Sequence, residues 1–150
     1  MAVKPIPDGY HTVTPYLVVE GAAQLMDFMK QTFQATEVER MTGPDGAIMH
    51  AEVKIGDSMV MVGEAMGGDQ QPLPGMIYLY VEDADTTYQR ALRAGATLTM
   101  EIADQFWGDR AGGVKDPTGI HWWIATHKED LSSEEIAKRA EDFMKQQAES

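Results

Sequence analysis

The sequence predicts an α+β fold of two tandem β-α-β-β-β modules, and three observations lead to this prediction. A strand-like segment at residues 16–20, YLVVE, recurs as YLYVE at residues 78–82, which is a displacement of 62 residues. After each copy, the spacing of apolar residues changes from two, typical of a strand, to about 3.6, typical of a helix. Three short strand-like segments, separated by turns, then follow each helix.

The first module is expected to span about residues 12–64. After its first strand, apolar residues recur at three- and four-residue steps and form one face of a helix: Ala22, Leu25, Met26, Met29 and Phe33. Strands are then predicted at residues 38–41, 48–55 and 59–62. The segments GPDG at residues 43–46 and GD at residues 56–57 are typical of the turns between them.

The second module is expected to span about residues 76–126 and follows the same plan. Its helix contains Ala84, Tyr88, Ala91 and Leu92 and ends near Gly95, because glycine adopts the left-handed conformation that stops a helix. Strands are predicted at residues 97–102, 110–115 and 121–126, with a DPTG turn at residues 116–119. A linker over residues 65–75 joins the modules, and residues 1–127 form one domain.

Residues 128–150 are predicted to form a separate helical tail. Ser132, followed three residues later by Glu135, is typical of a helix N-terminus. Ile136, Ala140 and Phe143 form a narrow apolar face. Such a face is expected either to dock on the body or on a partner subunit, or to leave a marginally packed helix that frays.

Composition and charge exclude several classes of function. The chain is 43% apolar and 24% charged, as in ordinary globular domains, and its lack of cysteine excludes disulfide scaffolds, zinc-thiolate sites and thiol nucleophiles. A net charge of -12 argues against nucleic acid and anionic membranes as partners. No apolar run approaches the roughly 20 residues that span a bilayer. The N-terminus lacks a hydrophobic signal core, so a cytoplasmic location is expected.

Three sequence features point to a known family: GYHTVTPYL at residues 9–17, DQFWGDR at residues 104–110, and Asp116-Pro117 with Trp122. Together with the tandem modules, they resemble the PhnB-like branch of the vicinal oxygen chelate superfamily, which contains glyoxalases, bleomycin resistance proteins and dioxygenases. The resemblance covers Thr12 to Thr126. It implies that the mixed sheets curl around a cavity with the helices outside, and that the protein is a homodimer.

The resemblance also allows the metal site of catalytic relatives to be examined. Their four ligands, commonly His and Glu, correspond here to Thr14, Met61, Met76 and Trp123. Hydroxyl, thioether and indole groups are poor ligands for the metals concerned, so no metal site and no cofactor are expected. Glu64 lies close to one of these positions and offers a single ligand. Binding of a divalent metal is expected only if its ligands occupy other positions than in the catalytic relatives.

Strand alternation predicts which side chains face the cavity implied by the family. The side chains expected to contact a ligand are Thr14, Tyr16, Met61, Met76, Tyr78, Tyr80, Trp107, Arg110, His121 and Trp123. The aromatic rings are expected either to stack against a flat ligand or to fill the space between the modules. Arg110 is expected to pair with an acidic ligand group or with its neighbour Asp109.

His50 and Glu52 form the candidate catalytic pair. They stand two apart on one strand face, about 7 Å from each other, a spacing that suits proton transfer or one edge of a rearranged metal site. The alternative is a polar strand face without chemistry. The sequence contains no Ser-His-Asp elbow, phosphate loop or dinucleotide fingerprint.

The sequence therefore favours a small-molecule binding protein that lacks the usual metal and holds an organic ligand, aromatic in character, between the modules. One alternative is a lyase or isomerase of the glyoxalase I type that uses a divalent metal at His50 and Glu52. A further alternative is a structural dimeric module with no ligand.

Overall fold

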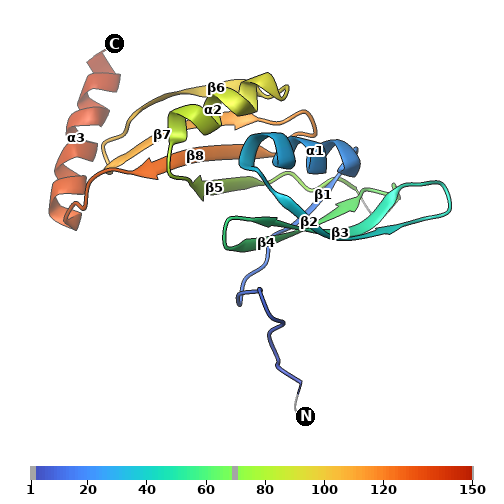
Figure 1. Ribbon diagram of the computed structural model, residues 1–150. Coiled ribbons are helices and arrows are strands. Elements are labelled where there is room, and N and C mark those ends of the chain that lie inside the picture. The colour runs from blue at the N-terminus through green and yellow to red at the C-terminus, as the bar shows by residue number, and fades with distance from the viewer. Residues whose placement is uncertain (1–2, 69–70, 150) are drawn as a thin grey trace.

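The computed structural model describes residues 3–68 and 71–149 of the chain (Figure 1). Residues 69 and 70 of the predicted linker, and residues 1 and 2 of the N-terminal segment, lie outside the described residues. The first module has five elements in chain order: β1 (Tyr16–Val19), α1 (Ala22–Phe33), β2 (Thr36–Thr42), β3 (Ile48–Ile55) and β4 (Ser58–Glu64). The second repeats them: β5 (Met76–Tyr80), α2 (Ala84–Arg93), β6 (Thr97–Asp104), β7 (Asp109–Lys115) and β8 (His121–His127).

Each module forms one four-stranded mixed sheet, which confirms the predicted plan. The strand orders are β1-β4-β3-β2 and β5-β8-β7-β6, so the two sheets have the same topology. The first strand of each module pairs in parallel with the last, and the remaining pairs are antiparallel. The expected α+β class, tandem modules and C-terminal helix are therefore all present.

The strand bounds differ from the sequence prediction by up to two residues, and one strand face departs from regular alternation. β1 begins at Tyr16, so Thr14, which was expected from strand alternation to face the cavity, lies before this strand; Pro15 between them has no N–H to donate to a neighbouring strand. In β3, regular alternation with buried Ala51, Val53 and Ile55 would also bury Met49, but Met49 is exposed and Ile48 is buried instead. A register irregularity in the β2–β3 pairing changes the alternation there.

The last strand of each module provides a side chain that caps that module's helix. Both carboxylate oxygens of Glu64 in β4 accept hydrogen bonds from the start of α1, from Gly21 N and Ala22 N, each at 2.9 Å. At the equivalent place, Thr126 Oγ1 accepts from Ala84 N at 2.9 Å. These bonds satisfy N–H groups that have no partner within the helix.

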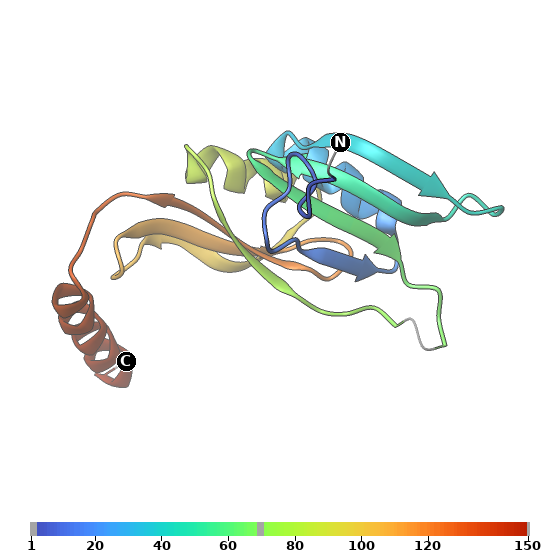
Figure 2. The ribbon, with the colours of Figure 1, turned by 90° about the horizontal axis from the view of Figure 1, so that it is seen from below.

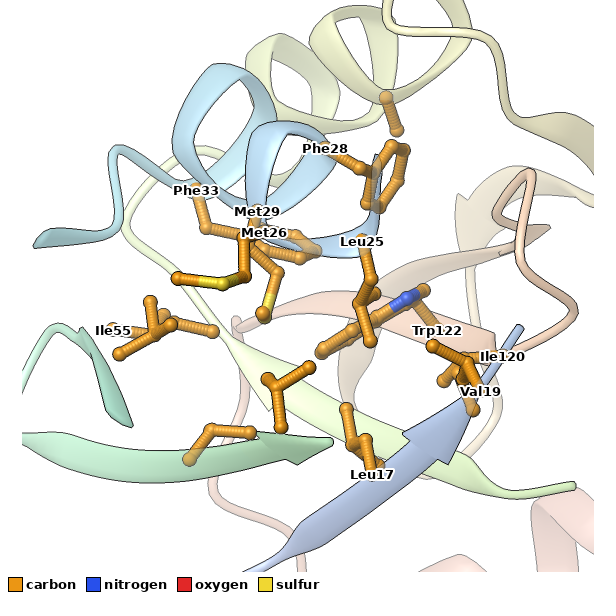
Figure 3. Close-up of a cluster of buried hydrophobic side chains, with 14 of the residues drawn as sticks. Leu17, Val19, Leu25, Met26, Phe28, Met29, Phe33, Ile55, Ile120 and Trp122 are labelled. Carbon is orange, nitrogen blue, oxygen red and sulfur yellow. The ribbon is translucent and has the colours of Figure 1, made fainter. Parts of the chain in front are cut away.

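The two modules share one hydrophobic core, which lies under α1 and α2 (Figure 3). Trp122 of β8 is fully buried and packs against Phe33 and Phe28 of α1, with ring centroids 4.8 Å and 6.4 Å away. A strand of the second module thus packs against the helix of the first. In Figure 1, α1 and α2 lie side by side on the same side of the sheets.

The opposite face of the sheets is open, because the two sheets do not close on each other within one chain. Several large apolar side chains on this open face are exposed to solvent: Tyr16, Met41, Met76, Tyr78, Tyr80 and Met100. The side chains that the resemblance expects to line a cavity are therefore exposed on the open face of the two sheets, and we name this face the trough.

α3 (Ser133–Glu149) extends from the end of the second module and stands clear of the sheets in both ribbon views (Figures 1 and 2). Its predicted cap is present, because Ser132 Oγ accepts a hydrogen bond from Glu135 N at 3.1 Å. None of its residues is buried, and Phe143 lies against Phe106 with ring centroids 5.4 Å apart. Over residues 3–68 and 71–149, no helix is both long and apolar enough to cross a bilayer.

Candidate functional site

Aromatic rings gather on the open face of the second module. We name Tyr78, Tyr80, Trp107 and Trp123 the aromatic cluster. Tyr78 stacks on Trp123 with a centroid distance of 6.0 Å and an interplanar angle of 12°. Tyr80 lies 5.3 Å from Tyr78, and Trp107 lies 6.1 Å from Trp123. The predicted aromatic residues of this module are therefore brought together on one surface.

Strand register explains why these rings can meet. Tyr78 in β5 pairs with Trp123 in β8, and Trp123 pairs with Gly113 in β7. Two residues further on, Tyr80 pairs with Ala125, which pairs with Ala111. Large aromatic side chains thus stand beside strand positions occupied by small residues, and this leaves room for the rings to lie across the sheet.

One buried carboxylate, that of Asp109 at the start of β7, holds the cluster together. Its Oδ2 accepts hydrogen bonds from Tyr78 Oη at 2.6 Å, Tyr80 Oη at 2.9 Å and Trp107 Nε1 at 3.1 Å. Its Oδ1 contacts His127 Nδ1 at 2.9 Å, and the other nitrogen of His127 contacts Asp130 Oδ1 at 2.8 Å. Asp109 is only 2% exposed, so its oxygens face the protein rather than solvent.

These contacts determine the charge states in the cluster. Burial opposes ionisation of Asp109, but the hydrogen bonds from Tyr78, His127, Tyr80 and Trp107 outweigh it, and the pKa of this carboxyl lies below its ordinary value. Burial and the bond to Asp109 raise the pKa of Tyr78, so its hydroxyl stays protonated as a donor. The bonds to Asp109 and Asp130 raise the pKa of His127.

The first module has a different arrangement, which contains the predicted pair. His50 Nε2 lies 3.4 Å from Glu52 Oε2, and His50 Nδ1 lies 3.1 Å from Tyr16 Oη. Tyr16 and Glu52 both pair with Met61 in the central strand β4, so these side chains stand in one row across the open face. The structure therefore links a phenol, an imidazole and a carboxylate in a single chain of contacts.

The metal positions of catalytic relatives do not fit a hard metal ion here. Thr14 precedes β1, and Met61, Met76 and Trp123 offer thioether and indole groups. Glu64 points to the helix side of its strand, where both of its oxygens cap α1. Among residues 3–68 and 71–149, no group of three or more His, Cys, Asp or Glu side chains is placed to hold a metal ion.

The remaining predicted contacts lie elsewhere. The pairing of Arg110 with Asp109 is wrong: Arg110 Nε donates to Asp85 at 2.7 Å and its Nη1 to Asp104 at 3.2 Å. Adjacent residues of a strand point to opposite faces, so Arg110 is turned toward α2 while Asp109 faces the trough. Met76 and His121 pair with each other at the opposite end of β5 and β8 from Asp109.

A cleft of about 1100 Å³ lies between the two modules and borders the aromatic cluster. Tyr78, Tyr80 and His127 contribute to its wall, opposite Phe33 of α1 and the start of β4. Thr32 also lines the cleft, and its buried Oγ1 has no hydrogen-bond partner among the described residues. Tyr78 and Tyr80 of the cluster therefore border both the trough and the cleft.

Sequence reasoning missed Asp109 and His127 as members of the site. Asp109 was considered only as a partner of Arg110, and His127 was not among the predicted site residues. The alternation that predicted His121 and Trp123 as contacts also includes His127. Asp109 pairs with His127, as Gly113 does with Trp123, so Asp109 lies on the same face. This signal was present in the strand pattern.

Comparison with known proteins identifies a family and several similar sequences. Residues 10–124 match the model of the Glyoxalase/Bleomycin resistance protein/Dioxygenase superfamily. An uncharacterized protein of Mycobacterium tuberculosis is 39% identical over 134 residues, which cover 83% of this chain and 79% of the relative. Protein YjdN of Escherichia coli is 30% identical over 93 residues, 59% of this chain and 63% of that protein.

Solved structures show the same fold at low sequence identity. TioX from Micromonospora sp. ML1 superimposes with a TM-score of 0.67 at 23% identity, covering 78% of this chain and 98% of TioX. The PhnB protein from Bacillus cereus gives a TM-score of 0.65 at 19% identity, with 77% and 99% covered. From the family match over most of its length, the chain belongs to the glyoxalase/bleomycin resistance protein/dioxygenase superfamily.

Proposed function

We propose that the protein binds a small organic molecule, and that the aromatic cluster is the main contact surface. The observation that supports this most strongly is the exposure of the rings: Tyr80 is 60% exposed and Tyr78 39%, although their hydroxyls are bonded to a buried carboxylate. Large exposed apolar surfaces on soluble domains mark interaction sites. A ring-lined trough beside a cleft suits a flat, partly apolar ligand.

Binding in this proposal needs no metal. The side chains at the family's metal positions are a hydroxyl, two thioethers and an indole, and none of them is a ligand that a Lewis-acid metal prefers. Elemental analysis of the purified protein is expected to find no stoichiometric divalent metal. One equivalent of metal that is lost in a His50→Ala variant would contradict this part of the proposal.

A second copy of the chain is proposed to cover part of the open face. The resemblance implies a homodimer, and the exposed methionine side chains of the trough, Met41, Met76 and Met100, are a surface that association would bury. Sedimentation at micromolar concentration is expected to show a dimer. A monomer at all concentrations would contradict the dimer without affecting the binding proposal.

Fluorescence tests the binding proposal directly, because Trp107 and Trp123 belong to the cluster. Titration with small aromatic compounds is expected to change the tryptophan emission in a saturable way. In Trp107→Phe and Trp123→Phe variants the signal is expected to fall, whereas the fully buried Trp122 contributes a constant background. A structure in which the partner's side chains fill the trough completely would favour the structural module without a ligand.

A second candidate function, a lyase or isomerase, is favoured by the contacts among Tyr16, His50 and Glu52. A carboxylate that orients an imidazole, which in turn contacts a phenol, is an arrangement suited to general acid–base catalysis. Under this proposal, the Glu52→Gln and Tyr16→Phe variants would both lower the turnover of a glyoxalase-type substrate by about tenfold or more. Equal turnover in the two variants and the parent protein would exclude this candidate.

A further inference from the structure

The aromatic cluster presents ring faces to a ligand and keeps its hydrogen-bonding groups to itself. The hydroxyls of Tyr78 and Tyr80 and the indole N–H of Trp107 all donate to Asp109. The Tyr80 hydroxyl is bonded to a buried carboxylate while the residue is 60% exposed, so its ring is accessible to a ligand. A ligand therefore contacts the ring faces of the cluster rather than its polar groups.

Hydrogen bonding to an anion makes these rings electron-rich. A phenol or indole that donates its hydrogen to a carboxylate is polarised, and negative charge shifts toward its ring. The face of an aromatic ring already attracts cations through its quadrupole. Three neighbouring rings bonded to one ionised carboxylate thus form a surface with reinforced negative potential.

The charged groups that contact the cluster, Asp109, His127 and Asp130, have a net negative charge. His127 is the one basic group bonded to Asp109 in the described residues, and Asp130 on its other nitrogen balances it. Even with His127 protonated, these three groups together keep one negative charge. Arg110 is directed to the opposite face by Asp85, and the whole chain has a net charge of -12, which favours the approach of cations.

We propose that the aromatic cluster binds an organic cation whose charge is distributed over alkyl groups, namely a quaternary ammonium group. This inference rests on the proposed binding function and names its ligand class. Both oxygens of Asp109 already have hydrogen-bond partners, so this carboxylate is not free to replace the water of a primary ammonium group at the ring faces. A quaternary ammonium group needs no acceptor and is attracted by the ring faces alone.

Three probes of similar size separate the contributions of charge and shape. Choline has the quaternary group, 3,3-dimethylbutan-1-ol is its neutral isostere, and ethanolamine has a primary ammonium group. By isothermal titration calorimetry, choline is expected to bind about tenfold more tightly than either of the others. A saturable change in tryptophan emission on addition of choline, reduced in the Trp107→Phe and Trp123→Phe variants, would place it near Trp107 and Trp123.

Variants connect this preference to the cluster. Tyr80→Leu removes an exposed ring and is expected to weaken choline binding by about fivefold or more. Asp109→Asn is expected to abolish the preference of choline over its isostere. Leu98→Ala is the control, because Leu98 is an exposed apolar side chain that pairs with buried Val114 on the helix side of the same sheet. It should leave choline affinity unchanged.

The possible outcomes separate a failure of the cation preference from a failure of the small-molecule binding function. If the neutral isostere binds as tightly as choline, the cation preference is wrong while the binding function stands. If choline, its isostere and neutral aromatic compounds all leave the fluorescence and heat unchanged, both are wrong. Should Asp109→Asn not fold, Tyr80→Leu decides: unchanged choline affinity in that variant would overturn the assignment to the cluster.

Discussion

At both ends of β7, a buried aspartate organises a tryptophan. Asp109 accepts the indole N–H of Trp107 on the trough face, and Asp116 accepts that of Trp122, at 2.7 Å, on the core face. Asp116, 4% exposed, also accepts from Thr118 N, Thr118 Oγ1 and Ile120 N in the turn before β8. One aspartate thus arranges a surface for ligands, and the other fixes a side chain of the core.

Removal of the Asp116 carboxylate should destabilise the protein strongly. Asp116→Ala leaves the buried N–H of Trp122 and the turn N–H groups without their acceptor, so we expect a loss of about 3 kcal/mol in the free energy of unfolding. Urea denaturation followed by far-UV circular dichroism measures this. Asp45→Ala is the control, because Asp45 accepts a single exposed bond from Ala47 N. A similar loss in both variants would show that the hydrogen bonds of Asp116 contribute no more to the free energy of unfolding than an exposed bond does.

His127 should make stability depend on pH near neutrality. Its pKa in the folded protein is raised above 6.5 by Asp109 and Asp130, so its charge stabilises the fold fully below about pH 6.5 and less as pH rises through the folded value. We expect the Tm difference between the parent protein and His127→Gln to be larger at about pH 6 than at about pH 9. A difference that grows with pH would contradict this.

Among the elements, the two helices show how the repeat is maintained with different chemistry. α1 has Gly21 at its N-cap, with no side-chain hydrogen bond from that position, and depends on Glu64 from β4. α2 has Asp83 at its N-cap, whose Oδ1 accepts from Thr86 N at 3.2 Å, and it needs only the hydroxyl of Thr126 from β8. The first module, whose helix has no local side-chain cap, therefore has the stronger cap from a distant residue, Glu64.

Glu64→Ala should accordingly destabilise the first module. The substitution removes two charge-assisted bonds at a helix N-terminus, where negative charge is favourable, and we expect a loss of about 2 kcal/mol. Glu20→Ala removes a neighbouring but exposed carboxylate and is expected to change stability by less than about 0.5 kcal/mol. Chemical denaturation of both variants checks the difference. An unaffected Glu64→Ala protein would mean that water replaces the cap without cost.

At the scale of the whole molecule, the modules are joined by packing as well as by chain connection. Trp122 belongs to the second module but lies against Phe28 and Phe33 of the first, so neither module has a complete core alone. In contrast, no residue of α3 is buried. α3 contacts the body through Phe106 and through the chain segment that precedes α3. The body and α3 should therefore unfold with little coupling.

Truncation before Ser133 tests this separation. Because α3 has no buried residue, we expect the shortened chain to keep its Tm within about 3 °C of the parent value at the same concentration. Scanning calorimetry measures the change, and sedimentation of the same sample shows whether α3 affects association. A larger fall in Tm, together with loss of the dimer, would show that α3 packs on a partner subunit.

The sequence alone determined the features that depend on local periodicity. The repeat of 62 residues, the change of apolar spacing and the turn residues predicted both modules, and Ser132 predicted the start of α3. Alternation placed Tyr78, Tyr80 and Trp123 on one face. These predictions succeed because the period of a strand or helix determines which side chains share a face, whatever lies further along the chain.

Only the tertiary structure decided which side chains meet. It brought Asp109 to Tyr78 and Trp107, paired Arg110 with Asp85 instead of Asp109, and used Glu64 as a cap. It also packed α1 against Trp122 and left the sheets open within one chain. These features join residues far apart in the chain, and they depend on register, on irregular strand pairs and on how the modules pack, which local spacing does not specify.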